Sequence, residues 1–227
     1  MNDIEEARAA VAVASRQLAA QGLLIGTAGN VSVLVEGHVA VTPTGADLSR
    51  ITPRDVTVIG RGGRVVAGHL QPTSEIELHL GVYAEHDAQA VVHTHAPEAT
   101  ALSCVLDELP CIHYQQLLLG GTVRVAPYAT FGTPALAASV VEALAGRSAA
   151  LMANHGSVTT GASLDKAVEN ALLLEWLCMV YRRACSIGEP KVLDEEQQAA
   201  VIEQAIERKY GTTRPVDQKP ADEREEP

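Results

Sequence analysis

The sequence predicts an α/β fold, a single domain with a central, mostly antiparallel or mixed sheet flanked by helices. Hydrophobic residues make up 47% of the 227 residues, which is enough to bury a substantial core. Alternating apolar segments joined by tight turns indicate antiparallel hairpins in the first part of the chain. Helical patterns are interspersed with the strands, so we expect mixed layers rather than a doubly wound parallel sheet.

The first part of the chain is expected to form two helices and two hairpins. Residues 3–21 have the composition of an amphipathic helix, which Gly22 ends. The first hairpin turns at residues 36–37 and the second at residues 61–63. Apolar residues at helical spacing then predict a short helix over 74–85.

The remainder of the chain is expected to alternate between strands and helices. The expected strands cover 90–96, 122–128 and 148–156. The expected helices begin after Pro97 and cover 133–145, 164–187 and 193–210.

The charge balance excludes several classes of partner. The chain has 17 Lys and Arg against 28 Asp and Glu, a formal net charge of −11. Nucleic acids and anionic membranes attract basic surfaces, which this chain lacks. No apolar run approaches the ~18 residues of a membrane span, and the acidic start of the chain does not resemble a signal peptide. We therefore expect a cytoplasmic protein that binds neither nucleic acid nor membrane, with a charged, disordered tail over 212–227.

The sharpest chemical feature is His93-Thr94-His95, inside an apolar segment that is expected to be a strand. Side chains at positions i and i+2 of a strand share one face, about 6.6 Å apart along the backbone, so two imidazoles there can converge on one metal ion. His155 follows another expected strand and offers a third imidazole. Three neutral nitrogens with an open position are typical of a catalytic zinc site. Spacing alone leaves metal binding and core histidines as equal alternatives.

Glu75 is a carboxylate that local structure does not explain. Ser74 and Glu77 fit a capping box that opens the expected helix, which gives both a structural role. Glu75 falls on the first turn, where a carboxylate could bind a neighbouring metal or act as a base beside it. Glu75 and His79 also share a helix face at positions i and i+4, and they form a rival ligand pair.

Three polar turns could together bind an anion. A phosphate can be bound by the backbone amides of glycine-containing turns, by hydroxyl groups, and by the N-terminus of a helix. The first turn, residues 26–30, is neither a dinucleotide fingerprint nor a P-loop, because its spacing is wrong for both. Each turn alone is typical of an ordinary loop, so the phosphate site is a hypothesis that requires all three. The candidate residues are Thr27, Asn30, Thr44, Gly45, Thr73 and Ser74.

These residues carry a resemblance to a known family. The segments GTAGNVS, TPTGAD, PTSEIELH, VVHTHAP, IHYQ, APYATFGT and ANHG occur in the order and at the distances found in the class II aldolase/adducin-head family. Within that family the chain most resembles the bacterial L-fuculose-1-phosphate aldolase branch. The match runs from about residue 5 to Tyr210, which implies one catalytic domain over residues 1–211, with the tail outside it.

The resemblance implies a metal site and two catalytic tyrosines. His93, His95 and His155 match the family's zinc-binding histidines, with Mn²⁺ or Co²⁺ as alternative ions. Glu75 matches the carboxylate that fills the metal's remaining position at rest and becomes the catalytic acid/base once substrate displaces it. Tyr114 matches a tyrosine that protonates the aldehyde oxygen.

Tyr210 matches a mobile tyrosine that closes the site. In relatives both tyrosines reach the site of a neighbouring subunit, which implies a ring-shaped homotetramer with active sites at the subunit interfaces. The phosphate pocket of the family matches the six candidate residues of the three polar turns.

The resemblance implies a metal-dependent aldolase. Its substrate would be a ketose 1-phosphate, such as L-fuculose 1-phosphate or a related deoxypentulose 1-phosphate, cleaved reversibly to dihydroxyacetone phosphate and a small aldehyde such as lactaldehyde. A Lewis-acidic ion suits this cleavage because electrons are left on the dihydroxyacetone-phosphate half.

Relatives use the same site for other reactions, which stay open here. They are methylthioribulose-1-phosphate dehydration, ribulose-5-phosphate 4-epimerisation and decarboxylation of a 3-oxo-tetronate 4-phosphate. Epimerising relatives have Asp directly before the tyrosine that matches Tyr114, whereas this chain has His113. A non-catalytic scaffold such as the adducin head is expected to lack the three histidines, which are present here.

Overall fold

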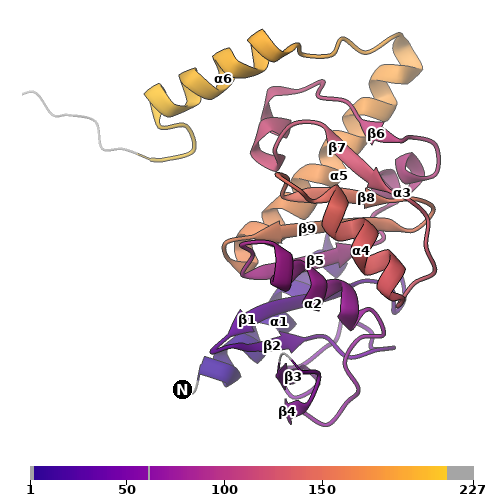
Figure 1. The fold of residues 1–227 in the computed structure, drawn as a ribbon, viewed down its shortest axis with the longest axis vertical. Coiled ribbons are helices and arrows are strands. Elements are labelled where there is room, and N and C mark those ends of the chain that lie inside the picture. Colours follow the sequence, from indigo (N-terminus) through magenta and orange to yellow (C-terminus); the bar gives the residue numbers. More distant parts are fainter. Residues whose placement is uncertain (1–2, 61, 214–227) are drawn as a thin grey trace, which may run out of the picture. The chain divides into compact units, whose positions relative to one another are not determined.

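The computed structural model describes residues 3–60 and 62–213 (Figure 1). The chain forms two compact units, Met1–Leu193 and Asp194–Pro227. The first unit contains the sheet with its helices, and the second contains α6 (Glu195–Arg208). The predicted tail lies outside the described residues except for its first two positions, and the predicted domain boundary at residue 211 stays a prediction. No described helix has the length and apolar character needed to cross a membrane.

One mixed sheet forms the centre of the first unit, which confirms the predicted α/β fold. The strands are β1 (Asn30–Val35), β2 (His38–Val41), β3 (Thr57–Gly60), β4 (Val65–Ala67), β5 (Ala90–Thr94), β6 (Glu108–Leu109), β7 (Val123–Ala126), β8 (Ala149–Met152) and β9 (Gly156–Gly161). Their order within the described residues is β4-β3-β2-β1-β5-β9-β8-β7-β6. Neighbouring strands are antiparallel except for the parallel pair β7 and β8.

Helices cover both faces of this sheet (Figure 1). One face carries α1 (Asp3–Ala20), α3 (Pro97–Ser103) and α5 (Leu164–Ile187), and the other carries α2 (Ile76–Glu85) and α4 (Pro134–Ala143). The adjacent residues Val91 and Val92 of β5 point into the two different cores. All of β5 is therefore buried, which explains why its sequence is apolar without alternation up to His93.

The register of the central strands gathers polar residues at one end of β5. Asn30, the first residue of β1, lies opposite His93 of β5. On the other side of β5, Thr94 pairs with Ser157 of β9. The turn that joins β8 to β9 carries His155, so it brings a third histidine to the same end of the sheet.

β9 approaches β5 so closely at Gly156 that a side chain has no room. A Cβ atom there would lie 2.3 Å from the Thr94 carbonyl oxygen and 3.4 Å from Cε1 of His93. We expect Gly156→Ala to lower the free energy of unfolding by about 1–3 kcal/mol, the usual cost of overpacking, as measured by urea unfolding. Gly188→Ala is the matched control, because nothing lies within 4 Å of a Cβ there and its φ of 176° is extended. Equal losses in both variants would contradict the close approach as the cause.

Most predicted elements are confirmed, and several details differ: the strands predicted over 90–96 and 148–156 end at Thr94 and Met152, and β6 was not predicted. Both N-terminal hairpins form, and the helix predicted over 164–187 has those bounds. β9 has no counterpart among the predicted strands, because its serine and threonines do not give an apolar pattern. The capping-box interpretation of Ser74 and Glu77 is wrong, since Glu75 is the N-cap of α2 and its side chain makes no cap hydrogen bond.

Candidate active site

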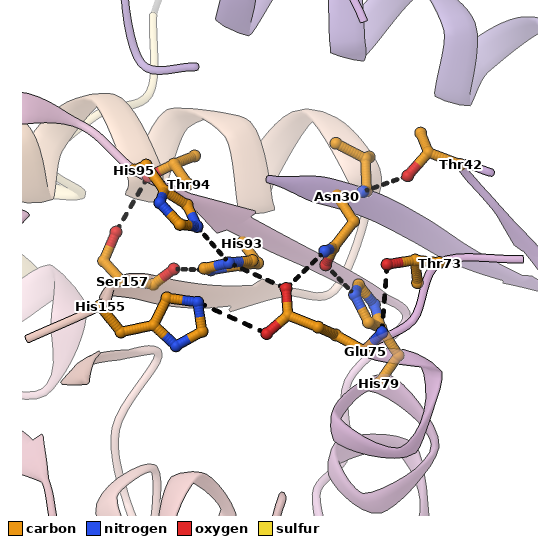
Figure 2. A network of polar contacts seen from close by, with 11 residues as sticks. Asn30, Thr42, Thr73, Glu75, His79, His93, Thr94, His95, His155 and Ser157 are labelled. Carbon is orange, nitrogen blue, oxygen red and sulfur yellow. Dashed lines mark hydrogen bonds and ion pairs between the residues drawn. The ribbon is translucent and has the colours of Figure 1, made fainter. Parts of the chain in front are cut away.

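Three imidazoles converge at the end of β5 (Figure 2). His93 belongs to the strand, His95 follows its last residue, and His155 lies in the turn before β9. Among the residues that the structure describes they form a group whose ligand atoms all lie within 4.8 Å of one another. Nε2 of His95 is 3.0 Å from Nε2 of His93. β5 ends at Thr94, so His95 lies one residue beyond the strand that carries His93.

The surroundings of these histidines fit a divalent cation. Nδ1 of His93 donates to the Ser157 carbonyl oxygen at 2.9 Å, which leaves the lone pair of Nε2 for the centre of the group. Burial lowers the pKa of His95 to about 4 and also lowers the pKa of His155, so both are neutral at neutral pH, as metal ligands must be. Two nitrogen ligands of a tetrahedral zinc ion lie about 3.4 Å apart. The observed 3.0 Å is close to that spacing.

The Glu75 carboxylate faces the same group. Its Oε2 lies 3.2 Å from Nε2 of His93, and its Oε1 lies 3.5 Å from Nε2 of His155. Burial by itself raises the pKa of Glu75, but the close contact with His93 and the hydrogen bond from Asn30 outweigh burial and hold the pKa well below its usual range. Oε1 is buried and has no hydrogen-bond partner among the described residues. A buried, ionised oxygen that lacks a hydrogen bond is costly unless a positive charge lies nearby. Its place beside three imidazoles therefore fits a site for a cation.

His79 does not join this group. It lies one helical turn after Glu75, but its Nε2 is 2.5 Å from Oδ1 of Asn30 and its Nδ1 is 2.6 Å from Oγ of Ser32. Its side chain is fully buried. Both ring nitrogens are engaged in the core, so the rival ligand pair of Glu75 and His79 is not formed.

Local backbone geometry explains how two loops present their side chains. Asn154 adopts a left-handed conformation with a φ of 56°, which asparagine tolerates better than most residues, and the turn it makes presents His155. The Thr73 hydroxyl accepts a hydrogen bond from the backbone N–H of Glu75 at 3.3 Å, and the Thr73 carbonyl accepts one from Ile76. Thr73 therefore anchors the start of α2, where Glu75 projects toward the histidines.

A cavity of about 310 Å³ opens next to the three imidazoles. Glu75, His95 and His155 line it, whereas His93 is fully buried behind them. The three polar turns that the sequence singled out also meet at this cavity. All six candidate phosphate residues line it: Thr27, Asn30, Thr44, Gly45, Thr73 and Ser74.

The structure does not bring Tyr114, one of the two predicted catalytic tyrosines, to this cavity. Tyr114 begins the 3-10 helix η1 (Tyr114–Leu119), is exposed, and packs its ring 4.7 Å from that of His113. It is not among the residues that line the cavity. Tyr210 belongs to the second compact unit, so its place relative to the site stays a prediction.

Two aromatic side chains at the cavity have no role in the sequence-based interpretation. Tyr128 and Phe131 lie between β7 and α4, are both exposed, and line the cavity. Phe131 is the chain's single phenylalanine, and aromatics make up 3% of the residues. Two aromatic residues so close together, in a loop of a chain with so few of them, are the sequence signal that could have identified this side of the cavity.

Comparisons with known proteins show the family to which the chain belongs. The Class II Aldolase and Adducin N-terminal domain matches residues 9–182. The 5-methylthioribulose-1-phosphate/5-deoxyribulose-1-phosphate aldolase of Rhodospirillum rubrum is 38% identical over 192 residues, covering 84% of this chain and 86% of that protein. The L-fuculose phosphate aldolase of Escherichia coli K12 is 40% identical over 185 residues, covering 80% of this chain and 86% of that protein.

The fold is also similar to that of solved structures. The structure of an L-fuculose 1-phosphate aldolase superposes with a TM-score of 0.84 at 35% identity, covering 88% of this chain and 95% of that one. Sequence and fold therefore agree, and the chain belongs to the family of the Class II Aldolase and Adducin N-terminal domain.

Proposed function

We propose that this chain is a metal-dependent aldolase that cleaves a ketose 1-phosphate into dihydroxyacetone phosphate and a small aldehyde. The substrates we propose are L-fuculose 1-phosphate, which gives lactaldehyde, and 5-deoxyribulose 1-phosphate, which gives acetaldehyde. One observation carries the proposal: three imidazoles converge beside a buried carboxylate at one end of a cavity whose other walls carry hydroxyl groups. The relatives named above are sugar-phosphate aldolases, which supports this activity without selecting the sugar.

His93, His95 and His155 would hold the cation, with Glu75 as a fourth ligand at rest. We propose Zn²⁺, because three nitrogens and one carboxylate oxygen suit it, with Mn²⁺ or Co²⁺ as alternatives. A divalent cation bound there supplies Lewis-acid polarisation of the substrate's carbonyl and hydroxyl oxygens.

Glu75 would carry the proton that moves at carbon. In the cleavage direction the C3–C4 bond breaks, the C4 hydroxyl loses its proton, and C3 gains one. Oε2 of Glu75 already accepts a hydrogen bond from Nδ2 of Asn30 at 2.9 Å. Oε1 makes no hydrogen bond to another described residue, so it is the oxygen available to take and release this proton.

The polar turns would bind the phosphate. The described residues that line the cavity include no lysine or arginine, so within this chain we propose that hydroxyl groups and backbone amides hold the anion. The backbone amides of Thr27, Gly45 and Ser74 make no hydrogen bond to another described residue. The start of α2 lies at the same wall, and its helix dipole favours negative charge.

The tyrosines would complete the site across a subunit interface. Because Tyr114 lies away from the cavity of its own chain, its proposed role in protonating the aldehyde oxygen requires a neighbouring copy. We therefore propose a homotetramer with active sites between subunits, in which Tyr210 closes the site after substrate has bound.

Removing Tyr210 is expected to slow catalysis without unfolding the protein. In a chain that ends at Lys209, kcat should fall on the order of tenfold. Without Tyr210 the site no longer excludes water and lacks one hydroxyl group that can donate a proton. The melting temperature should stay the same, since Tyr210 is exposed. A chain that ends at Tyr210 is the control, because it differs by that one residue. If both chains turn over the substrate equally fast, Tyr210 does not close the site.

A panel of sugar phosphates tests the proposed function. Purified protein loaded with Zn²⁺ is given ketose 1-phosphates and 5-phosphates, with coupled detection of dihydroxyacetone phosphate and mass spectrometry of the products. Aldolase activity releases dihydroxyacetone phosphate and an aldehyde. Loss of water, loss of carbon dioxide or inversion at C4 would instead identify a dehydratase, a decarboxylase or an epimerase. Protein that binds no divalent ion and leaves every sugar phosphate unchanged would favour a scaffold.

A further inference from the structure

A line of buried polar side chains leads from Glu75 into the core between β1 and α2. Nδ2 of Asn30 donates to Oε2 of Glu75 at 2.9 Å, and Oδ1 of Asn30 lies 2.5 Å from Nε2 of His79 (Figure 2). Ser32 Oγ lies 2.6 Å from Nδ1 of His79 and 2.7 Å from the Tyr83 hydroxyl. Ser32 and His79 are fully buried, and Asn30 is 3% exposed. The contacts from Glu75 through Asn30 and His79 to Ser32 are therefore made between buried side chains, and Tyr83 at the end of the line is half-buried.

The carboxylate at the end of this line fixes the direction of every hydrogen bond. An ionised carboxylate only accepts, so Asn30 has to turn its NH₂ group toward Glu75 and its oxygen toward His79. That oxygen also only accepts, so the proton of His79 has to be on Nε2. Nδ1 is then a bare acceptor for the Ser32 hydroxyl, and Ser32 in turn accepts from Tyr83. One tautomer of His79 and one orientation of the Asn30 amide satisfy the line.

Sequence spacing makes this arrangement compact. Asn30 and Ser32 are two residues apart on β1, so they share one face of the strand. His79 and Tyr83 are four residues apart on α2, so they lie one turn apart on the helix face that meets this strand. Burial lowers the pKa of His79 to about 3 and raises that of Tyr83, so both side chains are neutral.

We propose that His79 is a positioning residue for Glu75, held in its Nε2-protonated tautomer by the Asn30 oxygen that accepts from Nε2 and by the Ser32 hydroxyl that donates to Nδ1. By donating from Nε2, His79 prevents the Asn30 amide from rotating, and the amide then holds Oε2 of Glu75 so that Oε1 faces His155. His79 acts through Asn30 and touches neither cavity nor cation. This inference rests on the proposed role of Glu75 in proton transfer.

The tautomer can be observed directly. In long-range ¹H–¹⁵N spectra of the purified protein at neutral pH, the ring nitrogens of a neutral histidine differ in shift according to which one carries the proton. The resonances of His79 are identified by their loss in His79→Gln. We expect the Nε2-protonated form with a single, slowly exchanging proton. The Nδ1-protonated form, or a mixture of both, would overturn the inference.

Two substitutions with opposite geometry test the effect on catalysis. Glutamine places an amide nitrogen near the position of Nε2 and can still donate to Asn30, whereas asparagine reaches only the position of Nδ1. We expect His79→Asn to lower kcat by about 10–100-fold, as is typical for residues that orient a metal-site ligand, and His79→Gln to restore most of this loss. Metal content per chain should be the same in both. A histidine that only fills the core would give equal losses in the two variants, accompanied by equal falls in melting temperature.

Ser32→Ala provides an independent test if the asparagine variant does not fold. It removes the donor to Nδ1 while leaving the imidazole in place, so the Nε2-protonated tautomer loses one of the two contacts that hold it. We expect a lower kcat with unchanged metal content, together with a mixture of tautomers in the spectra. Wild-type kcat and a single tautomer in this variant would count against the role of Ser32. If the wild-type protein cleaves no ketose phosphate, the proposed function fails, whereas the tautomer measurement still tests this inference by itself.

Discussion

Replacing His95 with alanine is expected to remove the metal and the activity together. His95 supplies one of three nitrogens that converge at the end of β5, 3.0 Å from Nε2 of His93. With two imidazoles left, the site loses the ligand set of a catalytic cation. We expect less than a tenth of the wild-type metal content and a fall in kcat/KM on the order of 10³-fold, which corresponds to about 4 kcal/mol of transition-state stabilisation.

Metal analysis by mass spectrometry and a coupled assay for dihydroxyacetone phosphate measure the two effects in parallel. His69→Ala is the control, because His69 is exposed and is not among the residues that line the cavity. If His95→Ala keeps a full complement of metal, the three-histidine site is wrong. If it loses metal but keeps activity, the cation has no part in the cleavage.

Replacing Glu75 with glutamine is expected to separate metal binding from turnover. Glutamine keeps the size of the side chain, and the three histidines remain, so the protein should still bind a divalent ion. Proton transfer at carbon needs a group that can take and release a proton, which an amide cannot do. We expect kcat to fall by about 10²–10⁴-fold, the usual contribution of a positioned acid/base.

Glu77→Gln is the matched control for this variant. Glu77 lies two residues away on the same helix start and is exposed. Because the structure shows no capping bond there, we expect neither activity nor melting temperature to change. Wild-type turnover in Glu75→Gln would remove Glu75 from the mechanism, whereas loss of metal would assign it mainly to binding the ion.

The chemical groups of the site were readable from the residues themselves, whereas their assembly into one site followed only from the family resemblance. His93 and His95 are recognisable because two imidazoles interrupt an apolar segment, and Glu75 because no local structure explains it. That His155 meets them depends on β9, which pairs with β5 on one side and β8 on the other. Pairing between segments so far apart in the chain leaves no local pattern, and β9 itself has a polar sequence.

His79 shows a second limit of prediction from the sequence. Its spacing from Glu75 predicts a shared helix face, which is what α2 has, but the same spacing suits a ligand and a core hydrogen-bond donor equally well. What decides between them is the strand opposite, where Asn30 and Ser32 engage both ring nitrogens. Helical periodicity describes one element, whereas the function of a buried histidine is set by the element it packs against.

The order of strands also has a consequence during synthesis. β9 is the last strand among the described residues, yet it lies between β5 and β8. Until residues 156–161 leave the ribosome, the apolar strand β5 can pair with β1 but has an open edge on its other side. Nascent chains that stall before that point would expose this edge to one another, so this interval of translation is the one in which chaperones have most to protect.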